Sequence, residues 1–464
     1  MKTTFVDNIA IFFSSIREKV GGFFMSGHER SIKLRRNVLA SLIMKGITAC
    51  ISLLIIPITL HYVNPTQYGI WLTLSSMIAW FNLMDIGLAN GLKNKVAEAN
   101  ATNQVASIKA YISTAYAVLS AIAISIFLLF LVGNNFMDWE YILNFNDPSL
   151  KNLNVIASIM MASFCVQFFL QPLTSILTAL HSAASVSLIF TIGQIGCLVG
   201  IYLLTYNTSG SLLYLTLLLT GVPIAVQLLA TVWWFKNSLA QYRPNYRSID
   251  LKHARNLLST GGAFFFVQIG SLILFQTDNI IVTQLFGPEQ VTIFNISYKL
   301  FSVISILFTI AMTPLWPAFT DAYAKKDIEW IKGVFSRMYK YFLMLTACSL
   351  GLLFFSQKIF SIWLEDRVTI PLELSIAMAI YVIAICWMTI HCYFINGIGK
   401  VRLQMYLYIG STAINIPLTI ILGREFGLIG ITLSNILVVI FMGEVLRIQA
   451  GKIIKNSAFG IWNR

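Results

Sequence analysis

The chain contains little charge. Asp, Glu, Lys and Arg together make up 11% of its 464 residues, whereas an ordinary soluble domain carries about 25%. Hydrophobic residues make up 57% of the chain, and the mean hydropathy is +0.76. So few charged groups exclude an ordinary soluble protein. Most of the chain is therefore expected to lie in the hydrocarbon of a membrane.

Cysteine motifs and nucleotide-binding loops are also missing. The six cysteines are single residues inside apolar runs, so small apolar filler is the expected role and neither disulfides nor zinc is expected. The sequence has no glycine-rich phosphate loop, no paired metal-ligand motif and no nucleophile elbow. Because no soluble domain is expected either, we predict no enzyme activity, no cofactor and no ATP-driven step within this chain.

The chain does contain many apolar runs of about 20 residues, the length that crosses a bilayer. They predict an all-α polytopic membrane protein with about twelve transmembrane helices. The expected spans are 38–60, 69–91, 109–133, 152–180, 186–206, 212–235, 258–283, 291–317, 338–360, 373–398, 404–422 and 428–447. The fourth span contains Pro172, which is expected to interrupt it or end it early.

Basic residues are distributed unevenly between the two sides of these spans. The connections after even-numbered spans and the two terminal segments hold 26 of the 32 Lys and Arg residues, and the other connections hold four. By the positive-inside rule, both termini are cytoplasmic. The expected division is a basic segment (1–37), a first six-helix bundle (38–235), a basic cytoplasmic linker (236–257), a second six-helix bundle (258–447) and a cytoplasmic tail (448–464).

The first segment has its own pattern. Its apolar run IAIFF (residues 9–13) is too short for the hydrophobic region of a signal peptide, so no cleaved signal is expected. Apolar residues recur there at helical spacing beside Arg17 and Lys19. We expect a helix on the inner leaflet of the membrane, with a basic tail as the alternative.

An internal repeat relates the two halves. The stretch NPTQYGIW (64–71) aligns without gaps with GPEQVTIF (287–294), and EANA (98–101) aligns with DAYA (321–324) in the same register. Six spans separate the copies, so both halves insert in the same orientation. This predicts a pseudo-twofold axis along the membrane normal, with a central cavity between the bundles.

Apart from the basic residues counted with the connections, two lysines lie inside the expected spans, Lys45 in the first and Lys299 in the eighth. Each is roughly 10–12 Å deep, and they enter from opposite leaflets. An ammonium at the membrane centre costs at least about 2.5 kcal/mol. Three interpretations remain open. The lysines snorkel to the headgroups, they pair with Asp85 and Asp278, or they line a wet passage that receives phosphate.

Other polar side chains share helix faces with these residues. The expected cavity-lining residues besides the two lysines are Asn82, Gln268, Asn295, Tyr298 and Ser302. Asp85 and Asp278 are candidates for coupling to H+ or Na+, because a carboxylate in a low dielectric favours a bound proton or cation. A purely structural role for these aspartates is the alternative. His391 is expected to be an interior polar residue of the tenth span.

Two stretches carry a resemblance to a known family. YVNPTQYGIWLTLSSMIAWFNLMDIGLANGLKNKVAEANA (62–101) resembles the first hairpin of bacterial polysaccharide-biosynthesis membrane proteins, and its Asp-x-Gly-x-x-x-Gly arrangement at 85–91 is the closest part. GREFGLIGITLSNIL (423–437) resembles the same family's glycine-rich turn into its last common span. These proteins are the O-antigen and capsule flippases of the multidrug/oligosaccharidyl-lipid/polysaccharide exporter superfamily.

The resemblance implies a function and partners. Members of the family move an undecaprenyl-pyrophosphate-linked oligosaccharide across the bacterial inner membrane, often driven by a cation gradient. The implied partners are this lipid-linked oligosaccharide, the membrane, a polysaccharide polymerase and a chain-length regulator, and no nucleic acid is expected. A multidrug or cation antiporter on the same scaffold is the alternative function. A membrane polysaccharide polymerase is disfavoured, because the longest expected outward loop (134–151) has no Arg or His.

Overall fold

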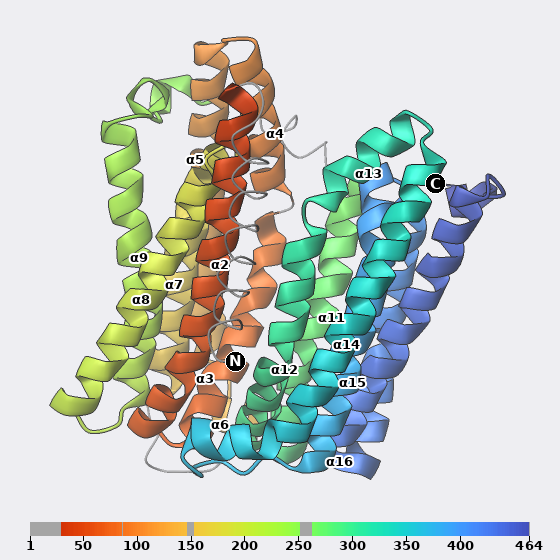
Figure 1. Cartoon of the computed structure of the whole chain (residues 1–464). Helices are drawn as coiled ribbons and strands as arrows, with labels where there is room; N and C mark the ends of the chain where they lie inside the picture. The colour runs from red at the N-terminus through yellow and green to blue at the C-terminus, as the bar shows by residue number, and fades with distance from the viewer. Residues whose placement is uncertain (1–28, 86, 146–152, 251–261, 464) are drawn as a thin grey trace, which may run out of the picture.

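Two helical bundles stand side by side in the computed structural model, which describes residues 29–85, 87–145, 153–250 and 262–463 (Figure 1). The amino-terminal bundle consists of α2 (Glu29–Tyr62), α3 (Pro65–Ala79), η1 (Trp80–Asp85), α4 (Leu88–Ala101), α5 (Val105–Asn134), α6 (Trp139–Ile142), α7 (Leu153–Ala179), α8 (Ala183–Asn207) and α9 (Leu212–Lys236). The short turns η3 (Ala240–Tyr242) and η4 (Tyr246–Ser248) follow it. The carboxy-terminal bundle consists of α11 (Gly262–Phe286), α12 (Pro288–Met312), α13 (Leu315–Ala324), α14 (Ile328–Leu364), α15 (Leu372–Ile398) and α16 (Arg402–Ile454), followed by η5 (Gly460–Asn463).

These helices reproduce the expected spans. Within the described ranges, ten helices are long and apolar enough to cross a membrane, and the bent pair of 65–85 and 88–101 would add another. Helix α16 covers both of the last two expected spans. It is divided at Gly427, whose backbone has φ 65° and ψ −145°, and hydrogen bonds from Asn415 to Ser434 and Asn435 show that its two parts fold back on each other. The expected all-α fold of two bundles is confirmed.

Two details differ from the sequence-based expectation. Helix α7 continues through Pro172 to Ala179, so the proline does not end the fourth span. Neighbouring helices in a bundle can compensate for the one backbone hydrogen bond that an internal proline removes. Helix α2 begins at Glu29, so residues 29–37 of the expected basic segment are helical, although the apolar span itself starts at Leu39. The helix expected on the inner leaflet belongs to residues 1–28, which lie outside the described residues. Part of the expected basic linker, within 251–261, lies outside them as well.

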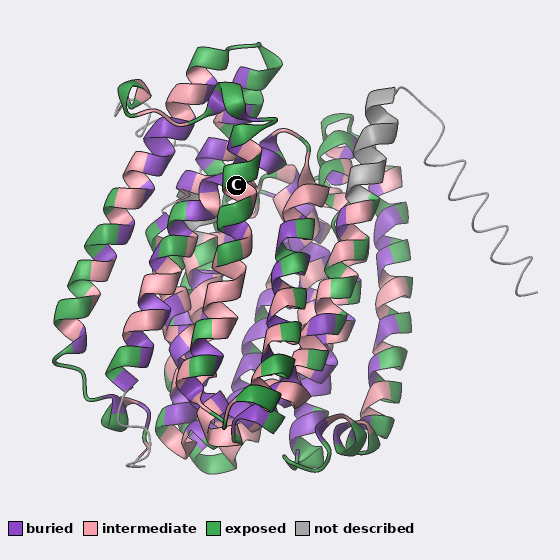
Figure 2. Ribbon diagram, turned by 90° about the vertical axis from the view of Figure 1, so that its left-hand side faces the viewer, coloured by how far each residue is buried: buried purple, intermediate pink, exposed green. Residues whose placement is uncertain are grey.

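Large apolar side chains cover the outer faces of both bundles. Leu129 is 74% exposed and Phe354 is 82% exposed, although both lie in the middle of long helices. Figure 2 shows exposed and half-buried residues along the outer faces of the helices over their whole height. Such surfaces are stable only against an apolar solvent. The protein is a multi-pass membrane protein.

The repeat found in the sequence is also present in the helix boundaries. Helix α3 begins at Pro65 and α12 begins at Pro288, and α4 ends at Ala101 whereas α13 ends at Ala324. Both pairs keep the register of the sequence repeat. Proline suits the first position of a helix because its missing N–H would have no helical partner there. The side chain of Asn64 also caps α3, accepting a hydrogen bond of 2.8 Å from the backbone N–H of Gln67.

The bundles meet along one face of α3. In Figure 1 the connections expected on the outside lie at the lower end, near α6, and those expected on the inside lie at the upper end, near α13. The residues of α3 that face the other bundle are Pro65, Gly69, Thr73 and Ser76, three or four positions apart, as on one side of a helix. We call this set of contacts the lower seam.

The lower seam is held by short polar contacts. The hydroxyl of Thr292 donates to the backbone oxygen of Pro65 at 2.6 Å. The hydroxyls of Thr73 and Thr283 are 2.6 Å apart. The amide of Asn279 donates to the hydroxyl of Ser76 at 2.7 Å. All these donors and acceptors are satisfied without water, as apolar surroundings require.

The tightest point of the lower seam lies between Gly69 and Pro288. A Cβ atom added to Gly69 would lie 1.7 Å from the backbone oxygen of Pro288. In the register of the repeat, Gly69 corresponds to Thr292 and Pro288 corresponds to Pro65. The contact between Gly69 and Pro288 is therefore the repeat image of the contact between Thr292 and Pro65. The pseudo-twofold axis passes between these two contacts.

Gly69→Ala tests this contact. Because the added Cβ would meet backbone rather than a movable side chain, we expect a lower melting temperature, corresponding to about 1–3 kcal/mol of overpacking. Gly46→Ala in α2 is the control, since a Cβ there has no atom within 4 Å and alanine favours a helix by about 0.5–1 kcal/mol. Thermal unfolding in detergent measures both variants. A melting temperature of Gly69→Ala equal to that of the wild type would contradict the contact.

Candidate functional site

Two separate cavities lie between the bundles, one above the other. The upper cavity has a volume of about 930 Å³ and is lined by α4 of the first bundle and by α11, α13, α15 and α16 of the second. The lower cavity has a volume of about 330 Å³ and is lined by α2, α3, α8, α9 and α12. The two share no lining residue. The upper cavity lies toward the end opposite the lower seam.

The upper cavity has a polar, nearly neutral lining. Its polar side chains include Asn90, Lys93, Asn94, Gln268, Ser271, Thr320, Thr389, Asn396 and Gln404. Lys93 is the one residue of this lining that carries a formal charge. The rings of Trp316 and Tyr393 stand edge to face with centroids 5.8 Å apart. Amides, hydroxyls and aromatic rings are groups that suit a neutral polyhydroxylated ligand.

Two buried oxygen atoms in the upper cavity accept no hydrogen bond from the described residues. The side-chain oxygens Oδ1 of Asn396 and Oε1 of Gln404 are buried and have no hydrogen-bond partner among the described residues. A buried acceptor without a donor costs about 1–3 kcal/mol, so water or a ligand is expected to donate to both atoms. A hydroxyl-bearing ligand supplies such donors.

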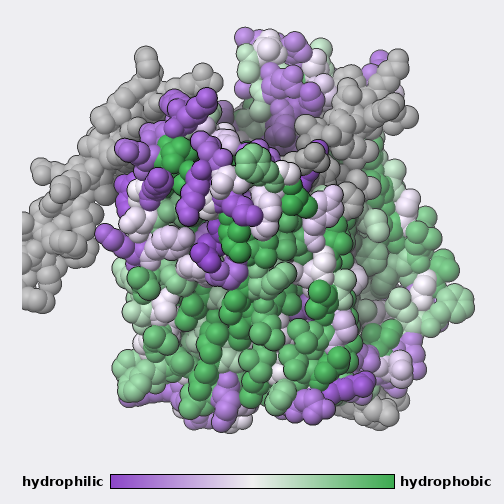
Figure 3. Space-filling view, turned by 90° about the vertical axis from the view of Figure 1, so that its right-hand side faces the viewer, coloured by the Kyte–Doolittle hydropathy of each residue, from purple (hydrophilic) through white to green (hydrophobic). Residues whose placement is uncertain are grey.

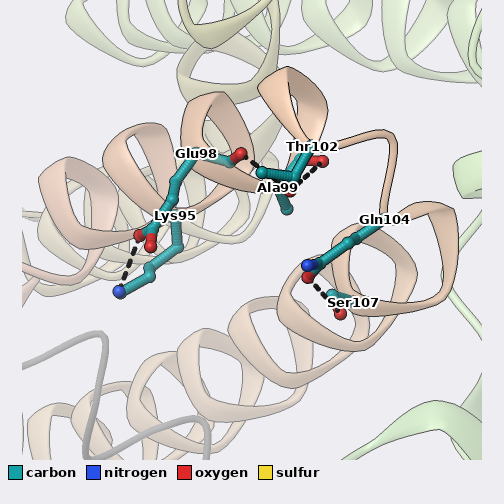
Figure 4. Close-up of polar contacts among 6 residues, drawn as sticks. All are labelled: Lys95, Glu98, Ala99, Thr102, Gln104 and Ser107. Atoms are coloured by element: carbon teal, nitrogen blue, oxygen red, sulfur yellow. Dashed lines mark hydrogen bonds and ion pairs between the residues drawn. The ribbon is translucent and has the colours of Figure 1, made fainter.

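Helix α4 brings Asn90, Lys93 and Asn94 into the upper cavity. At the start of the helix, the buried carboxylate of Asp85 accepts a hydrogen bond of 3.0 Å from the backbone N–H of Ala89. At its other end, the hydroxyl of Thr102 donates to the backbone oxygens of Glu98 and Ala99, and an ion pair of 2.8 Å joins Lys95 to Glu98 within α4 (Figure 4). Lys95 is thus paired on the helix surface.

The lower cavity contains Lys299. Its polar lining consists of Ser52, Gln194, Asn295, Tyr298 and Lys299, and the remaining wall is largely apolar and aromatic. Lys299 is half-buried and extends from α12 of the second bundle toward helices of the first. The ion pairs in the described part of the chain involve other residues. An anionic group in the lower cavity would therefore meet an ammonium whose charge no carboxylate already neutralises.

The environment of Lys299 is well ordered by hydrogen bonds. The amide of Asn295 donates to Asn279 at 2.7 Å and to the backbone oxygen of Val291 at 2.8 Å. The buried Ser302 donates to the backbone oxygen of Lys299 at 2.8 Å. Tyr298 lies beside Tyr381, with ring centroids 6.0 Å apart. The spacing of three and four residues on α12 thus places Asn295, Tyr298 and Lys299 together.

Lys45 is placed differently. It is exposed on α2 and lines neither cavity. Its neighbours on the same polar face pack inside the first bundle, since Ser41 contacts Ser187 at 2.7 Å and Thr48 contacts Thr191 at 2.9 Å. The polar face of the first span is therefore largely satisfied by α8. A role for Lys45 in binding stays a prediction.

Of the other expected site residues, some line a cavity and others bond to nearby backbone groups. Gln268 lines the upper cavity. Asn82 is exposed and donates to the backbone oxygen of Ala79 at 2.9 Å. Among the described ion pairs, none joins Lys45 to Asp85 or Lys299 to Asp278. Pairing with the aspartates, one of the three interpretations left open for the lysines, is therefore not found among the described residues. Asp85 caps a helix instead, and Asp278 faces away into its own bundle.

Asp278 belongs to a buried polar cluster between α11 and α16. Its Oδ2 accepts a hydrogen bond of 2.6 Å from the amide of Asn435. Asn415 donates in turn to Asn435 at 3.0 Å and to Ser434 at 3.1 Å, and Thr419 donates to Ser434 at 2.8 Å. The Oδ1 atom of Asp278 is buried with no partner among the described residues. A proton or a small cation would complete this cluster.

Apart from Gln268, the polar residues of the upper cavity are the ones that sequence reasoning missed. The sequence places Lys93 in a cytoplasmic connection, and Asn90, Asn396 and Gln404 lie near the expected ends of spans. The available signal was the stretch GLANGLKNK (87–95), which contains four of the lining residues and falls in the segment that resembles a known family.

Comparisons with known proteins give a consistent result. A family model described as "polysaccharide biosynthesis protein" matches residues 34–323, and a model described as MatE matches residues 263–421. The chain is 23% identical over 338 residues to a Salmonella typhimurium protein named provisionally as an O-antigen transporter, covering 70% of this chain and 75% of that protein. It is 20% identical over 363 residues to a Yersinia pseudotuberculosis protein named provisionally as an O-antigen export protein, covering 75% and 79%.

The fold is shared with solved transporters. An inward-facing structure of a multidrug resistance MATE family transporter of the MOP superfamily superposes with a TM-score of 0.74 at 13% identity, covering 91% of this chain and 100% of that one. An outward-facing structure of such a transporter superposes with a TM-score of 0.66 at 13% identity, covering 92% and 96%. At this identity the likeness shows the fold alone.

Proposed function

Because this chain belongs to the polysaccharide biosynthesis protein family, whose model matches residues 34–323, we propose that it is a flippase for a lipid-linked oligosaccharide. The substrate would be an undecaprenyl-pyrophosphate-linked repeat unit of an O-antigen, capsule or exopolysaccharide. It would pass from the inner to the outer leaflet of the bacterial inner membrane by alternating access, with both termini of the protein in the cytoplasm. The comparisons support a polysaccharide transporter of the MOP superfamily.

The chemistry of the two cavities carries the proposal. The upper cavity offers amides, hydroxyls, aromatic rings and two unpartnered buried oxygens, which suit the glycan. The lower cavity offers Lys299 among Asn295, Tyr298 and Gln194, which suits a phosphate. A lysine binds phosphate as a point charge without demanding fixed geometry, and so it can release the substrate again. Lys93 would receive the pyrophosphate first, at the upper end.

The interface between the bundles is closed at its lower end and open at its upper end, and alternating access would exchange these two states. The lower seam is closed by backbone and hydroxyl contacts, whereas the upper cavity separates the bundles at the other end. Rocking of one bundle against the other would break the lower seam and close the upper cavity. The expected linker, residues 236–257, would connect the two moving bundles. With the termini inside, the described state is open toward the cytoplasm.

The prenyl tail would stay outside the protein core. Transfer of each CH₂ of the tail out of lipid costs about 0.8 kcal/mol, so only the polar part of the substrate would enter the cavities. An apolar groove of about 1070 Å³ lies at the junction of the bundles, between α2, α8 and α14, and includes Leu54, Ile58, Ile359 and Ile362. This groove offers the tail a path along the junction.

Coupling to a cation would use Asp278. Its carboxylate is buried, has one oxygen bonded to Asn435 and has the other unpartnered. Binding of H+ or Na+ there would alter the packing of α11, which also supplies Thr283 and Asn279 to the lower seam. One helix thus connects the candidate coupling site to the contacts that must open. Asp85 is the less suitable candidate, because its carboxylate caps α4.

A multidrug or cation antiporter is the alternative, since the MatE model matches residues 263–421. The neutral, amide-rich upper cavity and the ammonium in the lower one suit it less well, because a cationic drug would meet Lys93 and Lys299. If the substrate is a lipid-linked repeat unit, the polysaccharide polymerase and the chain-length regulator that act on it are the expected protein partners.

Lys299 substitutions test the substrate assignment. In a strain that lacks this protein, Lys299→Ala should lower the surface glycan about tenfold or more at equal expression, because a charge-assisted hydrogen bond contributes about 1.5–3 kcal/mol. Lys299→Arg should retain more glycan than Lys299→Glu, and the exposed Lys326→Ala should resemble the wild type. Unchanged glycan in Lys299→Ala would contradict the role. Altered drug resistance without any effect on glycan would favour the antiporter.

A disulfide across the lower seam tests alternating access. In a variant without the native cysteines, Thr73→Cys with Thr283→Cys should cross-link on oxidation and stop glycan export until a reductant is added, because the seam can no longer open. The pair Ser41→Cys with Ser187→Cys is the matched control. Its hydroxyls are equally close but lie within one bundle, so cross-linking should leave export intact. Export by the protein cross-linked at the lower seam would refute the rocking mechanism.

If a cation binds Asp278, the Asp278→Asn variant should no longer be stabilised by that cation. The wild-type melting temperature in detergent should depend on Na+ at constant ionic strength, or on pH if the ion is H+, since a bound ion stabilises the folded state. Asp278→Asn should lose this dependence and Asp85→Asn should keep it. The same dependence in wild type and Asp278→Asn would rule out coupling at Asp278.

A further inference from the structure

A further cavity lies within the second bundle, away from the interface between the bundles. It has a volume of about 600 Å³ and is formed by α14, α15 and α16 near the upper end. We call it the basic groove. Its lining consists of Lys332, Phe335, Ser336, Tyr339, Lys340, Leu343, His391, Arg447, Ala450, Gly451, Ile454 and Lys455. It shares no residue with the upper or the lower cavity.

The basic groove is lined by one face of α14 and one face of α16. The residues that α14 contributes are spaced by three and four positions from Lys332 to Leu343, and those of α16 are spaced in the same way from Arg447 to Lys455. The hollow exists because small side chains face it, among them Ser336, Ala450 and Gly451. A Cβ atom added to Gly451 would have no atom within 4 Å.

The basic groove is positively charged. Lys332, Lys340 and Lys455 are exposed, and the described ion pairs include none of them. Arg447 pairs with Glu444 at 2.7 Å, so its charge is partly neutralised. No Asp or Glu side chain belongs to the lining. Three ammonium groups therefore surround one hollow without an anion.

Apolar side chains lie among and beside these cations in the lining. Phe335, Leu343 and Ile454 belong to the lining, and Leu343 is 64% exposed. The inner wall is rigid, since Tyr339 and the buried His391 are hydrogen-bonded at 3.1 Å. Figure 3 shows hydrophilic surface gathered at the upper end of this side of the molecule, directly above a broad hydrophobic band.

The depth of the basic groove matches the membrane interface. Helix α14 has 37 residues, about 55 Å at 1.5 Å per residue, which exceeds the roughly 30 Å of hydrocarbon. Its groove residues begin four positions after its start at Ile328, and those of α16 lie at and beyond the end of the span expected at 428–447. Lipid headgroups are expected at the ends of spanning helices, which is the level of these residues.

We propose that the basic groove binds the headgroup of an anionic phospholipid. The phosphate would lie among Lys332, Lys340 and Lys455, and an acyl chain would descend over Leu343 along the hydrophobic outer face. Basic pockets between membrane-spanning helices on the cytoplasmic side recognise such headgroups. The positive-inside rule alone needs cations near this end of the helices. It does not need them around a hollow with an apolar wall.

This proposal is independent of the transported substrate, because the basic groove lies outside the interface between the bundles. A lipid there would bridge α14 and α16 and fix the second bundle to the inner leaflet. The first bundle would then be the part that moves relative to the membrane.

The experiment measures lipid binding by the purified full chain in detergent, using native mass spectrometry. The probes are dioleoylphosphatidylglycerol, dioleoylphosphatidylcholine and inorganic phosphate. The test variant is Lys332→Ala with Lys340→Ala and Lys455→Ala. The matched control is Lys325→Ala with Lys326→Ala and Arg337→Ala, which removes equal charge from exposed residues near the same end that lie outside the groove.

We expect phosphatidylglycerol to bind the wild type and the control variant with similar affinity. Each lysine near an anionic headgroup contributes about fivefold in affinity, so the groove variant should bind at least tenfold more weakly. Gly451→Leu keeps every cation but fills the hollow, and it should weaken binding as well. Replacement of the three lysines by arginine should restore binding, which separates lost charge from lost folding.

Four results would overturn the proposal. The control variant could lose as much affinity as the groove variant, or Gly451→Leu could bind like the wild type. Either result would show diffuse attraction to surface charge. Equal binding of phosphatidylcholine would show that the negative charge is irrelevant. Binding of inorganic phosphate as tight as that of phosphatidylglycerol would show a site for free anions rather than a lipid site.

Discussion

The direct approach of α3 to α12 is the contact on which the rest of the structure depends. At Gly69 the backbone of one bundle meets the backbone of the other, with the Pro288 carbonyl where a side chain would otherwise be. Hydroxyl and amide groups complete the closure on either side. Because these groups satisfy one another, the bundles can meet tightly at one end without burying unpaired polar atoms. The polar cavities are then confined to the space above and beside this contact.

Polar side chains inside the membrane serve two purposes here. Some hold helices of one bundle together, such as Ser41 with Ser187 and Thr48 with Thr191. Others keep unpaired capacity toward a cavity, such as Asn396, Gln404 and Lys299. Both kinds look alike in a sequence, because each is a polar residue in an apolar run. Only the packing shows whether a neighbouring helix already supplies the partner.

This difference explains how much of the site could be predicted. The spans follow from hydropathy, since the membrane fixes their length. Asn295, Tyr298 and Lys299 are brought together as expected, because residues three and four apart share one helix face. The pairing of Lys45 with Asp85 is not found among the described residues, and deciding it required knowledge of how far apart two helices lie. The upper cavity could not be predicted for another reason. It is formed by residues such as Lys93, which charge assigns to a connection between spans, and Gln404, which lies at the very start of an expected span.

The repeat has a consequence for the origin of this architecture. In its register, Lys299 stands where the first half has Ser76, and Asp278 stands where it has Ile55. The contacts of the lower seam are therefore contributed by both related halves, whereas the ammonium of the lower cavity and the carboxylate of the buried polar cluster occur in the second half. Such an arrangement is what duplication of an ancestral half-length gene would leave after divergence. Closure of the lower seam needs complementary surfaces on both copies, whereas interior positions of the two copies can differ, as Lys299 and Ser76 do.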